Sequence, residues 1–498
     1  MLEVFQNVFN LQSLILILAG VVIGNIFGCI PGLNTPIAVA LVLPFTMVMD
    51  PVPTVCLLMG IYMGGVSGGL VSAVLLKIPG TAASVATTFD GYPMTLKGQG
   101  TRAMTLGVFA SFFGGMFSSV MLLLLAPALS KLAIGFGPWE YFGATILALA
   151  MVCVLLQGNM LKGFISLGIG LLAKCVGMSP LDGIAFRFNF GSTNLQSGFA
   201  LIAVIIGVFA LPEIMDNASR IDQKLTAGKV EKKWFHMLDV RSIIRHFPNM
   251  LRSSIIGTVI GILPGLGGGP AGMLAYATSK KVSKTPEEFG KGCEDGVIAS
   301  ESANNATTGG ALIPMLSLAV PGDTTTAIIL GAFSIQGIVV GPNLSLMQPT
   351  LFQTIILAVF VANIFMFLYQ GSTLGFMAKM VEVPKMYLMP IIVVFCVTGI
   401  FCLNNNAFDL YYTLGFIVLG YVLDKNGYPV IPLIMGMILG GTVEENLRRS
   451  ISYYGSFWSS LTQFSAGTVM VVLAAAIVVV SVALAVRRSM QKKEKAVE

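Results

Sequence analysis

The stretch that decides the fold is Gly28-Cys29-Ile30-Pro31-Gly32-Leu33, which returns as Gly261-Ile262-Leu263-Pro264-Gly265-Leu266. The offset from Gly28 to Gly261 is 233 residues, close to half of the 498-residue chain. Both copies lie within strongly apolar sequence. Proline lacks an N–H group and ends a helix. The pairs Pro31-Gly32 and Pro264-Gly265 therefore predict structural breaks in segments that are otherwise helical.

A second pair of breaks follows the first. Ile78-Pro79-Gly80-Thr81 lies downstream of the first copy, and Val320-Pro321-Gly322-Asp323 lies downstream of the second, with an offset of 242 from Pro79 to Pro321. Inside a membrane, the backbone groups that a break frees need partners from the protein or from a ligand. Matched breaks in the two halves of a membrane chain are typical of a transporter binding site.

The composition is that of a membrane protein. The chain is 55% hydrophobic and only 10% charged, with a mean hydropathy of +0.85, whereas a soluble domain carries about 25% charged residues. Apolar runs such as 12–30, 350–378 and 466–486 are near the roughly 20 residues that a spanning helix needs. We predict an all-α polytopic membrane protein with about 12–15 membrane segments, some broken or re-entrant. The lipid bilayer is its first partner.

Residues that would carry catalysis or hold a cofactor are scarce. The seven cysteines are scattered without a C-x-x-C motif, and the two histidines, His236 and His246, fall in a polar stretch. The net charge of +6 is concentrated in loops and the tail, as positive-inside topology predicts. We therefore expect no enzyme, no cofactor beyond a coupling ion, no metal site beyond one for Na⁺, and no nucleic acid. A channel, or an intramembrane enzyme acting on a small polar molecule, is the alternative.

Charge and hydropathy divide the chain into four parts. We predict a first membrane repeat at 1–214, a cytoplasmic linker at 215–249, a second membrane repeat at 250–442, and a C-terminal helix with a basic cytoplasmic tail at 443–498. The linker is placed in the cytoplasm because it carries seven lysine and arginine residues, and basic loops favour that side.

The loops of the two halves carry opposite charge bias. Loop 47–54 has no basic residue, whereas its counterpart 278–293 has four lysines. After the second break the bias is reversed, because Lys97 and Arg102 have no basic equivalent in 337–349. This pattern predicts two inverted-topology repeats, with the N-terminus outside and the C-terminus in the cytoplasm. The alternative is two halves with ordinary loops and a chance charge pattern.

The segments after the second breaks are the candidate binding site. A helix that restarts after Pro-Gly presents free N–H groups and the positive end of its dipole, which suit an anion, while broken ends also free carbonyl groups that suit Na⁺. The predicted substrate-binding residues are Gly80, Thr81, Ser84, Gly322, Thr324 and Thr325. The predicted cation-binding residues are Asn304, Asn305 and Asp323.

Each of these residues also has a structural interpretation. Glycines pack membrane helices, and a single Ser or Thr commonly bonds its own backbone. Asp323 could cap the helix that starts at Thr324, a role compatible with ion binding. Glu301 could belong to the cation site or to the cytoplasmic mouth, and Asp90 is read as a turn or gate residue.

Several long motifs occur in the order of a known family. The tract from Leu76-Lys77-Ile78-Pro79-Gly80-Thr81 through Asp90-Gly91-Tyr92-Pro93 resembles the large membrane subunit of the tripartite tricarboxylate transporters. So do the stretches 283–292 and 301–306, Ile313-Pro314 and Pro321-Gly322-Asp323. The resemblance covers about residues 10 to 440.

The resemblance implies a secondary transporter of the bacterial cytoplasmic (inner) membrane. It implies a periplasmic substrate-binding protein that delivers a di- or tricarboxylate, and a small membrane subunit as second partner. Uptake would be coupled to Na⁺ or H⁺ and would proceed by alternating access. Whether the subunit also forms a homodimer is left open.

Overall fold

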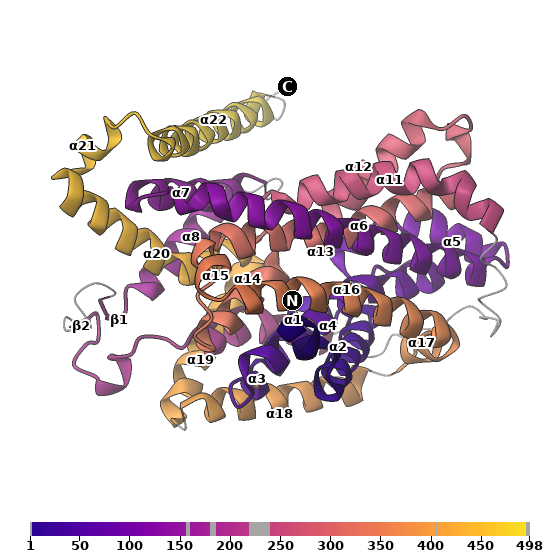
Figure 1. Cartoon of the computed structure of the whole chain (residues 1–498), viewed down its shortest axis with the longest axis horizontal. Helices are drawn as coiled ribbons and strands as arrows, with labels where there is room; N and C mark the ends of the chain where they lie inside the picture. Colours follow the sequence, from indigo (N-terminus) through magenta and orange to yellow (C-terminus); the bar gives the residue numbers. More distant parts are fainter. Residues whose placement is uncertain are drawn as a thin grey trace. The chain divides into compact units, whose positions relative to one another are not determined.

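Helices make up nearly all of the structure, a computed structural model that describes residues 2–155, 160–179, 186–218, 240–383, 385–404 and 406–494 (Figure 1). Six helices in this part of the chain are long and apolar enough to cross a membrane, and four further apolar helices are shorter. The predicted helical, multi-pass membrane class is confirmed. The predicted number of membrane segments stays a prediction. Residues 219–239, which contain His236 and most of the basic linker residues, lie outside the described residues, so their predicted location stays a prediction as well.

The chain forms two compact units, of which unit 1 comprises Met1–Lys131 and Glu213–Leu403. Its first elements are α1 (Leu2–Phe9), α2 (Leu11–Cys29), α3 (Thr35–Thr46), α4 (Pro51–Leu76), the 3₁₀ turn η1 (Ala82–Ser84), α5 (Thr88–Leu96) and α6 (Gly100–Ile134). They are followed by α11 (Val240–Ile262), α12 (Gly268–Val282), the 3₁₀ turn η5 (Pro286–Glu288), α13 (Glu294–Leu318), α14 (Thr324–Ile335), α15 (Pro342–Met347), α16 (Pro349–Ser372), α17 (Leu374–Met380) and α18 (Lys385–Asn404).

Unit 2 comprises Leu132–Pro212 and Asn404–Glu498. It contains α7 (Pro138–Leu155), α8 (Met160–Lys174), the paired strands β1 (Gly177–Met178) and β2 (Phe186–Arg187), η2 (Thr193–Leu195), α9 (Leu201–Ile205), the π-helix η3 (Ile206–Ala210), α19 (Ala407–Lys425), α20 (Ile431–Tyr454), α21 (Phe457–Leu461) and α22 (Ala466–Glu494). Helix α10 (Leu211–Ala218) starts in unit 2 and continues into unit 1. Each unit thus contains segments from both halves of the sequence. The boundaries at 214, 249 and 442, which were predicted for the two repeats and the linker, stay predictions.

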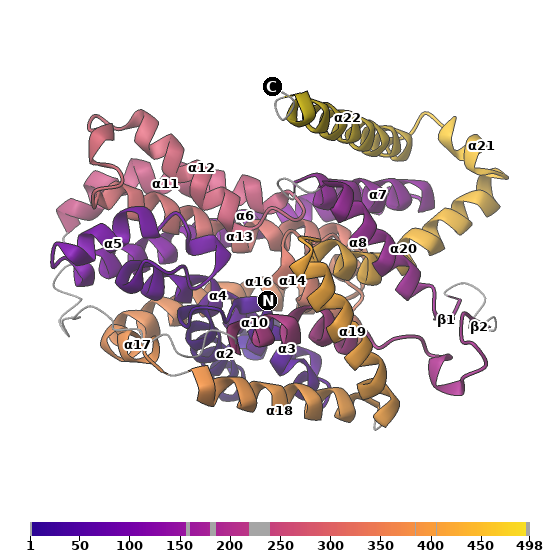
Figure 2. The ribbon, with the colours of Figure 1, turned by 180° about the vertical axis from the view of Figure 1, so that it is seen from behind.

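Unit 1 contains one arrangement of helices twice. A long helix ends at a Pro-Gly break, a short helix follows, and a second long helix leads to the next break: α2, α3 and α4 in the first half, α11, α12 and α13 in the second (Figures 1 and 2). Gly32 and Gly265 adopt positive φ of 88° and 81° at equivalent places. The second long helices both end at a non-glycine residue in the left-handed region, Lys77 (φ 59°) and Ala319 (φ 58°). Such a conformation persists only where the surroundings impose it, so the two breaks are built alike.

Close approach of backbones holds each half together. A Cβ on Gly68 would lie 2.6 Å from the carbonyl oxygen of Asn25, and a Cβ on Gly310 would lie 2.5 Å from that of Thr258. These contacts are equivalent at the offsets of 233 and 242. Glycine is needed because only a residue without a Cβ lets membrane helices come this close.

The two Pro-Gly phrases of each half meet in space. Gly80 packs against the carbonyl oxygen of Gly28, and Gly322 packs against that of Gly261. In the second half a hydrogen bond of 2.8 Å from Gly265 N to Gly322 O joins the two phrases. In each half, the first Pro-Gly phrase therefore packs against the second break and supports it.

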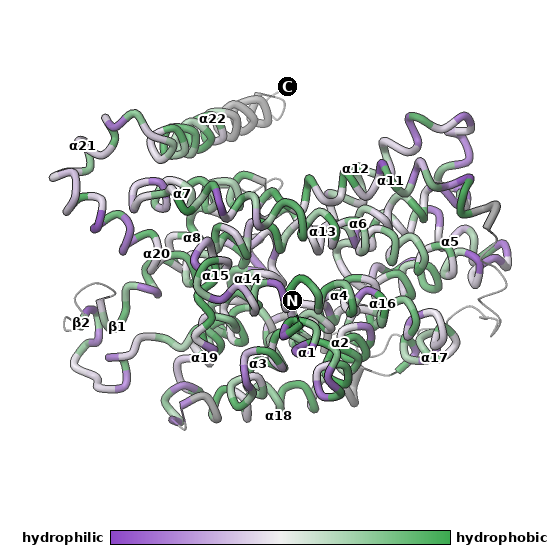
Figure 3. The backbone as a smooth tube through the Cα atoms, viewed as in Figure 1, coloured by the Kyte–Doolittle hydropathy of each residue, from purple (hydrophilic) through white to green (hydrophobic). Residues whose placement is uncertain are grey.

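Within unit 1, the short helix of each half packs against the segment that follows the second break of the other half. Helix α3 packs against α14, and α12 packs against η1, while α4 contacts α13 between them. Both long helices are buried over nearly their whole length, although α13 carries many polar residues. Figure 3 shows apolar colouring along α2 and α18, and a hydrophilic end of unit 1 where α12 turns into α13. Polar side chains at the centre of an apolar unit are the natural place to look for a ligand site.

Candidate functional site

Asp323 caps the helix that restarts after the second break. Its Oδ1 accepts a hydrogen bond of 2.7 Å from the backbone N of Thr326, and the Thr326 hydroxyl is 2.9 Å from the Asp323 backbone N. The other carboxylate oxygen, Oδ2, accepts a bond of 2.6 Å from the hydroxyl of Tyr62 on α4. The expectation that Asp323 could be an N-cap is confirmed. Because the Asp323 side chain already accepts from a backbone N–H group in the first turn of α14, the adjacent Thr324 and Thr325 would offer an anion less than the sequence suggested.

The first half has the same turn with a smaller capping residue. Thr81 N lies 3.3 Å from the hydroxyl of Ser84, and this hydroxyl donates to Thr81 O at 2.9 Å. Thr81 and Ser84 correspond to Asp323 and Thr326 at the offset of 242. The Thr81 hydroxyl oxygen is buried and has no hydrogen-bond partner among the described residues.

A second buried carboxylate lies on α13. Glu301 is 0% exposed; its Oε1 accepts from Thr87 at 2.5 Å and its Oε2 from Ser111 at 3.0 Å. No lysine, arginine or histidine of the described chain pairs with Glu301 or Asp323. Because an unpaired charge is costly in a low-dielectric interior, both carboxylates are candidates for binding a cation or a proton.

The two asparagines that follow Glu301 differ in their environment. Asn305 donates to the backbone oxygen of Glu301 at 3.2 Å, within its own helix. Asn304 donates to the backbone oxygen of Val66 on α4 at 3.4 Å, and its amide also interacts with Glu301. The side-chain oxygen of Asn304 is buried without a partner among the described residues and faces Gly268, the first residue of α12. Asn304 is therefore the predicted ligand with free coordinating capacity.

At the hydrophilic end of unit 1, Asp90 connects the two halves. Its Oδ1 accepts three backbone hydrogen bonds, from Gly290 at 2.9 Å and from Gly292 and Cys293 at 2.8 Å each. Its Oδ2 accepts from the hydroxyl of Tyr276 at 2.8 Å. Asp90 belongs to the first half and the loop 290–293 to the second, so this buried carboxylate holds the end of the unit closed.

A charged cluster reinforces the same end. Arg102 forms an ion pair with Glu294, and His246 contacts Glu294 at 3.2 Å and Asp295 at 2.8 Å. Burial of the His246 ring opposes its charged form, but the hydrogen bonds and charges of Asp295 and Glu294 outweigh it and raise its pKa to about 9. The hydrogen bond from His246, together with Arg102, lowers the pKa of Glu294 to about 2 despite partial burial.

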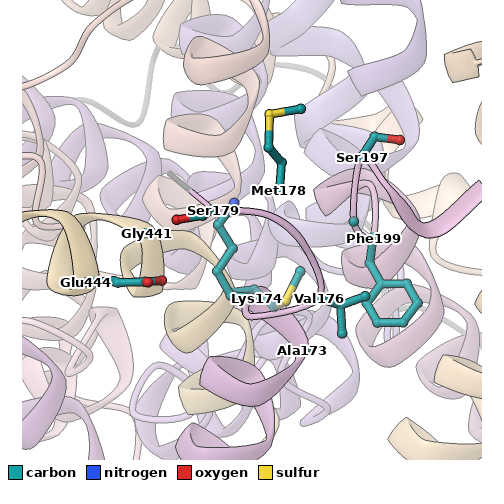
Figure 4. A pocket seen from close by; sticks show the side chains of 11 residues that line it. Ala173, Lys174, Val176, Met178, Ser179, Ser197, Phe199, Gly441 and Glu444 are labelled. Carbon is teal, nitrogen blue, oxygen red and sulfur yellow. The ribbon is translucent and has the colours of Figure 1, made fainter. Parts of the chain in front are cut away.

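Unit 2 contains a cavity of about 310 Å³ that none of the predicted site residues lines (Figure 4). Lys174, Ser179, Ser197, Phe199 and Glu444 are among its lining residues. Glu444 is held by Arg187, with bonds of 2.6 and 3.0 Å, and by Arg448 at 2.8 Å. The carboxylate of Glu444, on one side of the cavity, is thus already paired with two arginines.

Comparison with known protein families gives a match over most of the chain. A family model described as "Tripartite tricarboxylate transporter TctA family" matches residues 14–435. The chain belongs to the TctA family. TctA proteins are one part of a three-part transport system with a binding protein and a small subunit, so this chain is a transporter component, which is consistent with the expectation that it is not an enzyme.

Two proteins from Agrobacterium vitis are similar in sequence to this chain. One, named "Uncharacterized 52.8 kDa protein in TAR-I ttuC' 3'region", is 35% identical over 448 residues, which is 90% of this chain and 88% of the relative. The other, named "Uncharacterized protein in TAR-II ttuC' 3'region", is 40% identical over 195 residues, which is 39% of this chain and 81% of the relative. No solved structure matches the chain.

Sequence reasoning missed three members of this TctA site: Tyr62, Thr87 and Ser111. Tyr62 and Ser111 lie in apolar runs of the first half, where an aromatic or hydroxyl residue is typical of packing, and Thr87 is one of several hydroxyl residues in the tract after the break. A signal for Tyr62 existed, because it stands 242 residues before Asn304 and so occupies the equivalent place in α4. Thr87 and Ser111 had no such signal.

Proposed function

We propose that this protein is the large membrane subunit that carries a di- or tricarboxylate across the bacterial cytoplasmic membrane in symport with Na⁺ or H⁺. A periplasmic binding protein delivers the substrate, and the small membrane subunit accompanies the transport step. The N-terminus lies outside, the C-terminus lies in the cytoplasm, and the two repeats have inverted topology. Alternating access then exposes one central site to each side in turn.

The observation that carries this proposal is the pair of breaks at the centre of unit 1. Both are lined by buried hydroxyl and amide groups, and two carboxylates that have no basic partner among the described residues lie beside them, Glu301 and Asp323. Uncompensated carboxylates at membrane depth favour cation coupling. The predicted substrate ligands Gly80, Thr81 and Ser84 line one break, and Gly322, Thr324 and Thr325 line the other.

The closed end of the unit supports alternating access. Asp90 and the cluster around Glu294 join the halves at the end that the lysine-rich loop 278–293 assigns to the cytoplasm. In the inverted scheme, opening this end and closing the opposite end would move the central site from one side to the other. The Asp90 contacts would then break in each transport cycle.

Uptake by reconstituted vesicles tests the function. The chain, its small subunit and its binding protein are reconstituted, and radiolabelled citrate is offered first among a panel of di- and tricarboxylates. Accumulation above equilibrium should require an inward Na⁺ or H⁺ gradient and should saturate with substrate. Flux that only equilibrates, at a rate indifferent to both gradients, would favour the channel and refute symport.

A further inference from the structure

The two breaks form two equivalent places between the halves of unit 1, and these places are filled differently. At the offset of 242, Tyr62 corresponds to Asn304 and Thr81 corresponds to Asp323. In one place Tyr62 reaches across and bonds Asp323 at 2.6 Å. In the other place the two side chains are shorter, and neither the Asn304 oxygen nor the Thr81 hydroxyl has a partner among the described residues.

The side chains of Asn304 and Thr81 both contact the same stretch of α4. The Asn304 amide is anchored at Val66, and the Thr81 hydroxyl lies 2.7 Å from where a Cβ on Gly69 would be. Residues three apart on a helix are neighbours at about 5–6 Å. At the equivalent place the longer Tyr62 spans the distance to Asp323, whereas the shorter Asn304 and Thr81 form no hydrogen bond with each other, so one small cation could join them.

The orientation of Asn304 decides which kind of ligand fits. Its amide nitrogen faces two acceptors, the Val66 carbonyl and the Glu301 carboxylate. The amide oxygen then points toward Gly268 of α12, where it has no partner among the described residues and can only accept. A buried acceptor left unpaired costs about 1–3 kcal/mol, so the place favours a donor or a cation over an anion.

The charge of the surroundings favours a cation. Glu301 lies one turn before Asn304 on α13, is fully buried, and receives hydrogen bonds only from the hydroxyls of Thr87 and Ser111 besides the Asn304 amide. A positive ion beside Asn304 would neutralise this carboxylate. Asparagine and threonine do not titrate, so these two ligands select a metal ion of the hard, oxygen-seeking kind and not a proton.

We propose that a single coupling Na⁺ is bound between Asn304 and Thr81, with Glu301 as the nearby compensating charge. This assignment rests on the proposed symport and specifies its ion and its place. Asp323 is not a ligand, because Tyr62 and Thr326 already occupy its oxygens. Asn305 is not a ligand either, because its side-chain oxygen, unlike that of Asn304, is not among the buried oxygens without a partner in the described chain. Tyr62 closes the equivalent place, so this pair of breaks binds one ion and not two.

Binding of radioactive Na⁺ to the purified full-length chain in lipid nanodiscs tests the assignment without transport. Asn304→Ala and Thr81→Val should each weaken Na⁺ binding at least about tenfold. Thr105→Val is the matched control, since the buried Thr105 hydroxyl bonds only the backbone of its own helix, at Thr101 O. It should leave the affinity within about twofold of the parent, as removal of an internal helix contact predicts.

Two results would overturn the assignment. One is unchanged Na⁺ affinity in both Asn304→Ala and Thr81→Val. The other is a loss confined to Asp323→Asn, which would move the ion to the place that Tyr62 closes. If Na⁺ binds as expected but uptake ignores a Na⁺ gradient, the symport fails while the ion site stands. If uptake needs Na⁺ and both variants bind it normally, the site fails while the symport stands.

Discussion

Gly322→Ala tests the central role of the breaks most directly. A Cβ at this position would lie 2.5 Å from the Cα of Ala311 and would also overlap the carbonyl oxygen of Gly261. Ordinary contact begins at 3.4 Å. Both neighbours are backbone atoms, so no side-chain rotation can make room. Helix α11 or α13 would have to move by about 0.9 Å in a closely packed interior.

The expected loss follows from that displacement. Overpacking of this kind costs typically about 1–3 kcal/mol, and the upper half of the range applies because only rigid backbone can yield. The free energy of unfolding should fall by about 2–3 kcal/mol. The next residue is Asp323, so the break and the start of α14 move with Gly322. Misplacement by about 1 Å near a site can cost roughly 100-fold in rate, and uptake should fall by about that factor.

Unfolding by denaturant in mixed micelles measures the first quantity, and vesicle uptake measures the second. Gly80→Ala should repeat both losses, because its Cβ would lie 2.6 Å from the Ser72 hydroxyl and 2.9 Å from the Cα of Gly69. Gly168→Ala on α8 is the control, since nothing lies within 4 Å, and helix propensity makes it neutral or stabilising by up to about 1 kcal/mol. Normal uptake and unchanged unfolding in both break variants would refute the reasoning.

Four further predictions concern the ends of unit 1 and the topology. Folded stability should decline as pH rises from 6.5 through about 9, because the raised pKa of His246 adds stability that is complete below 6.5, and thermal unfolding of His246→Gln should lack this decline. The lowered pKa of Glu294 adds stability that is lost as pH falls from 4.5 through about 2, and Glu294→Gln should lack that acid loss. Asp90→Ala should release the loop and make Cys293, 9% exposed, reactive toward a maleimide, with Asp90→Ala in a Cys293→Ala background as control. Reporter fusions should place the N-terminus outside and the C-terminus inside; identical placement of both ends would contradict the inverted scheme.

The breaks and their spacing could be predicted from the sequence because Pro-Gly disrupts a helix locally. Proline ends a helix whatever surrounds it, so Pro79 and Pro321 could be recognised without knowing the fold. The N-cap role of Asp323 was open to prediction for the same reason, since capping depends on residues within one turn. Offsets of 233 and 242 further predicted which helices would be equivalent.

The partners of the buried carboxylates could not be predicted from the sequence, because they come from distant helices. Thr87 and Ser111 lie about two hundred residues before Glu301, and a single Ser or Thr hydroxyl commonly bonds the backbone of its own helix. Asp90 is a similar case. Its partners are backbone N–H groups of a loop, which every residue carries and no sequence pattern marks.

The duplicated arrangement makes each half a reference for the other. Asn34 caps α3 by accepting from Ile37 N at 3.1 Å, whereas its equivalent Gly267 has no side chain to cap α12. Two other equivalent pairs also differ in side-chain size: Tyr62 with Asn304, and Asp323 with Thr81. In each pair the smaller residue lies at the junction of α12 and η1. At all three pairs of equivalent positions, the smaller side chain therefore lies at the same one of the two equivalent places. Because buried polar groups are normally paired, this difference between the halves, more than any single residue, supports the proposed ion site.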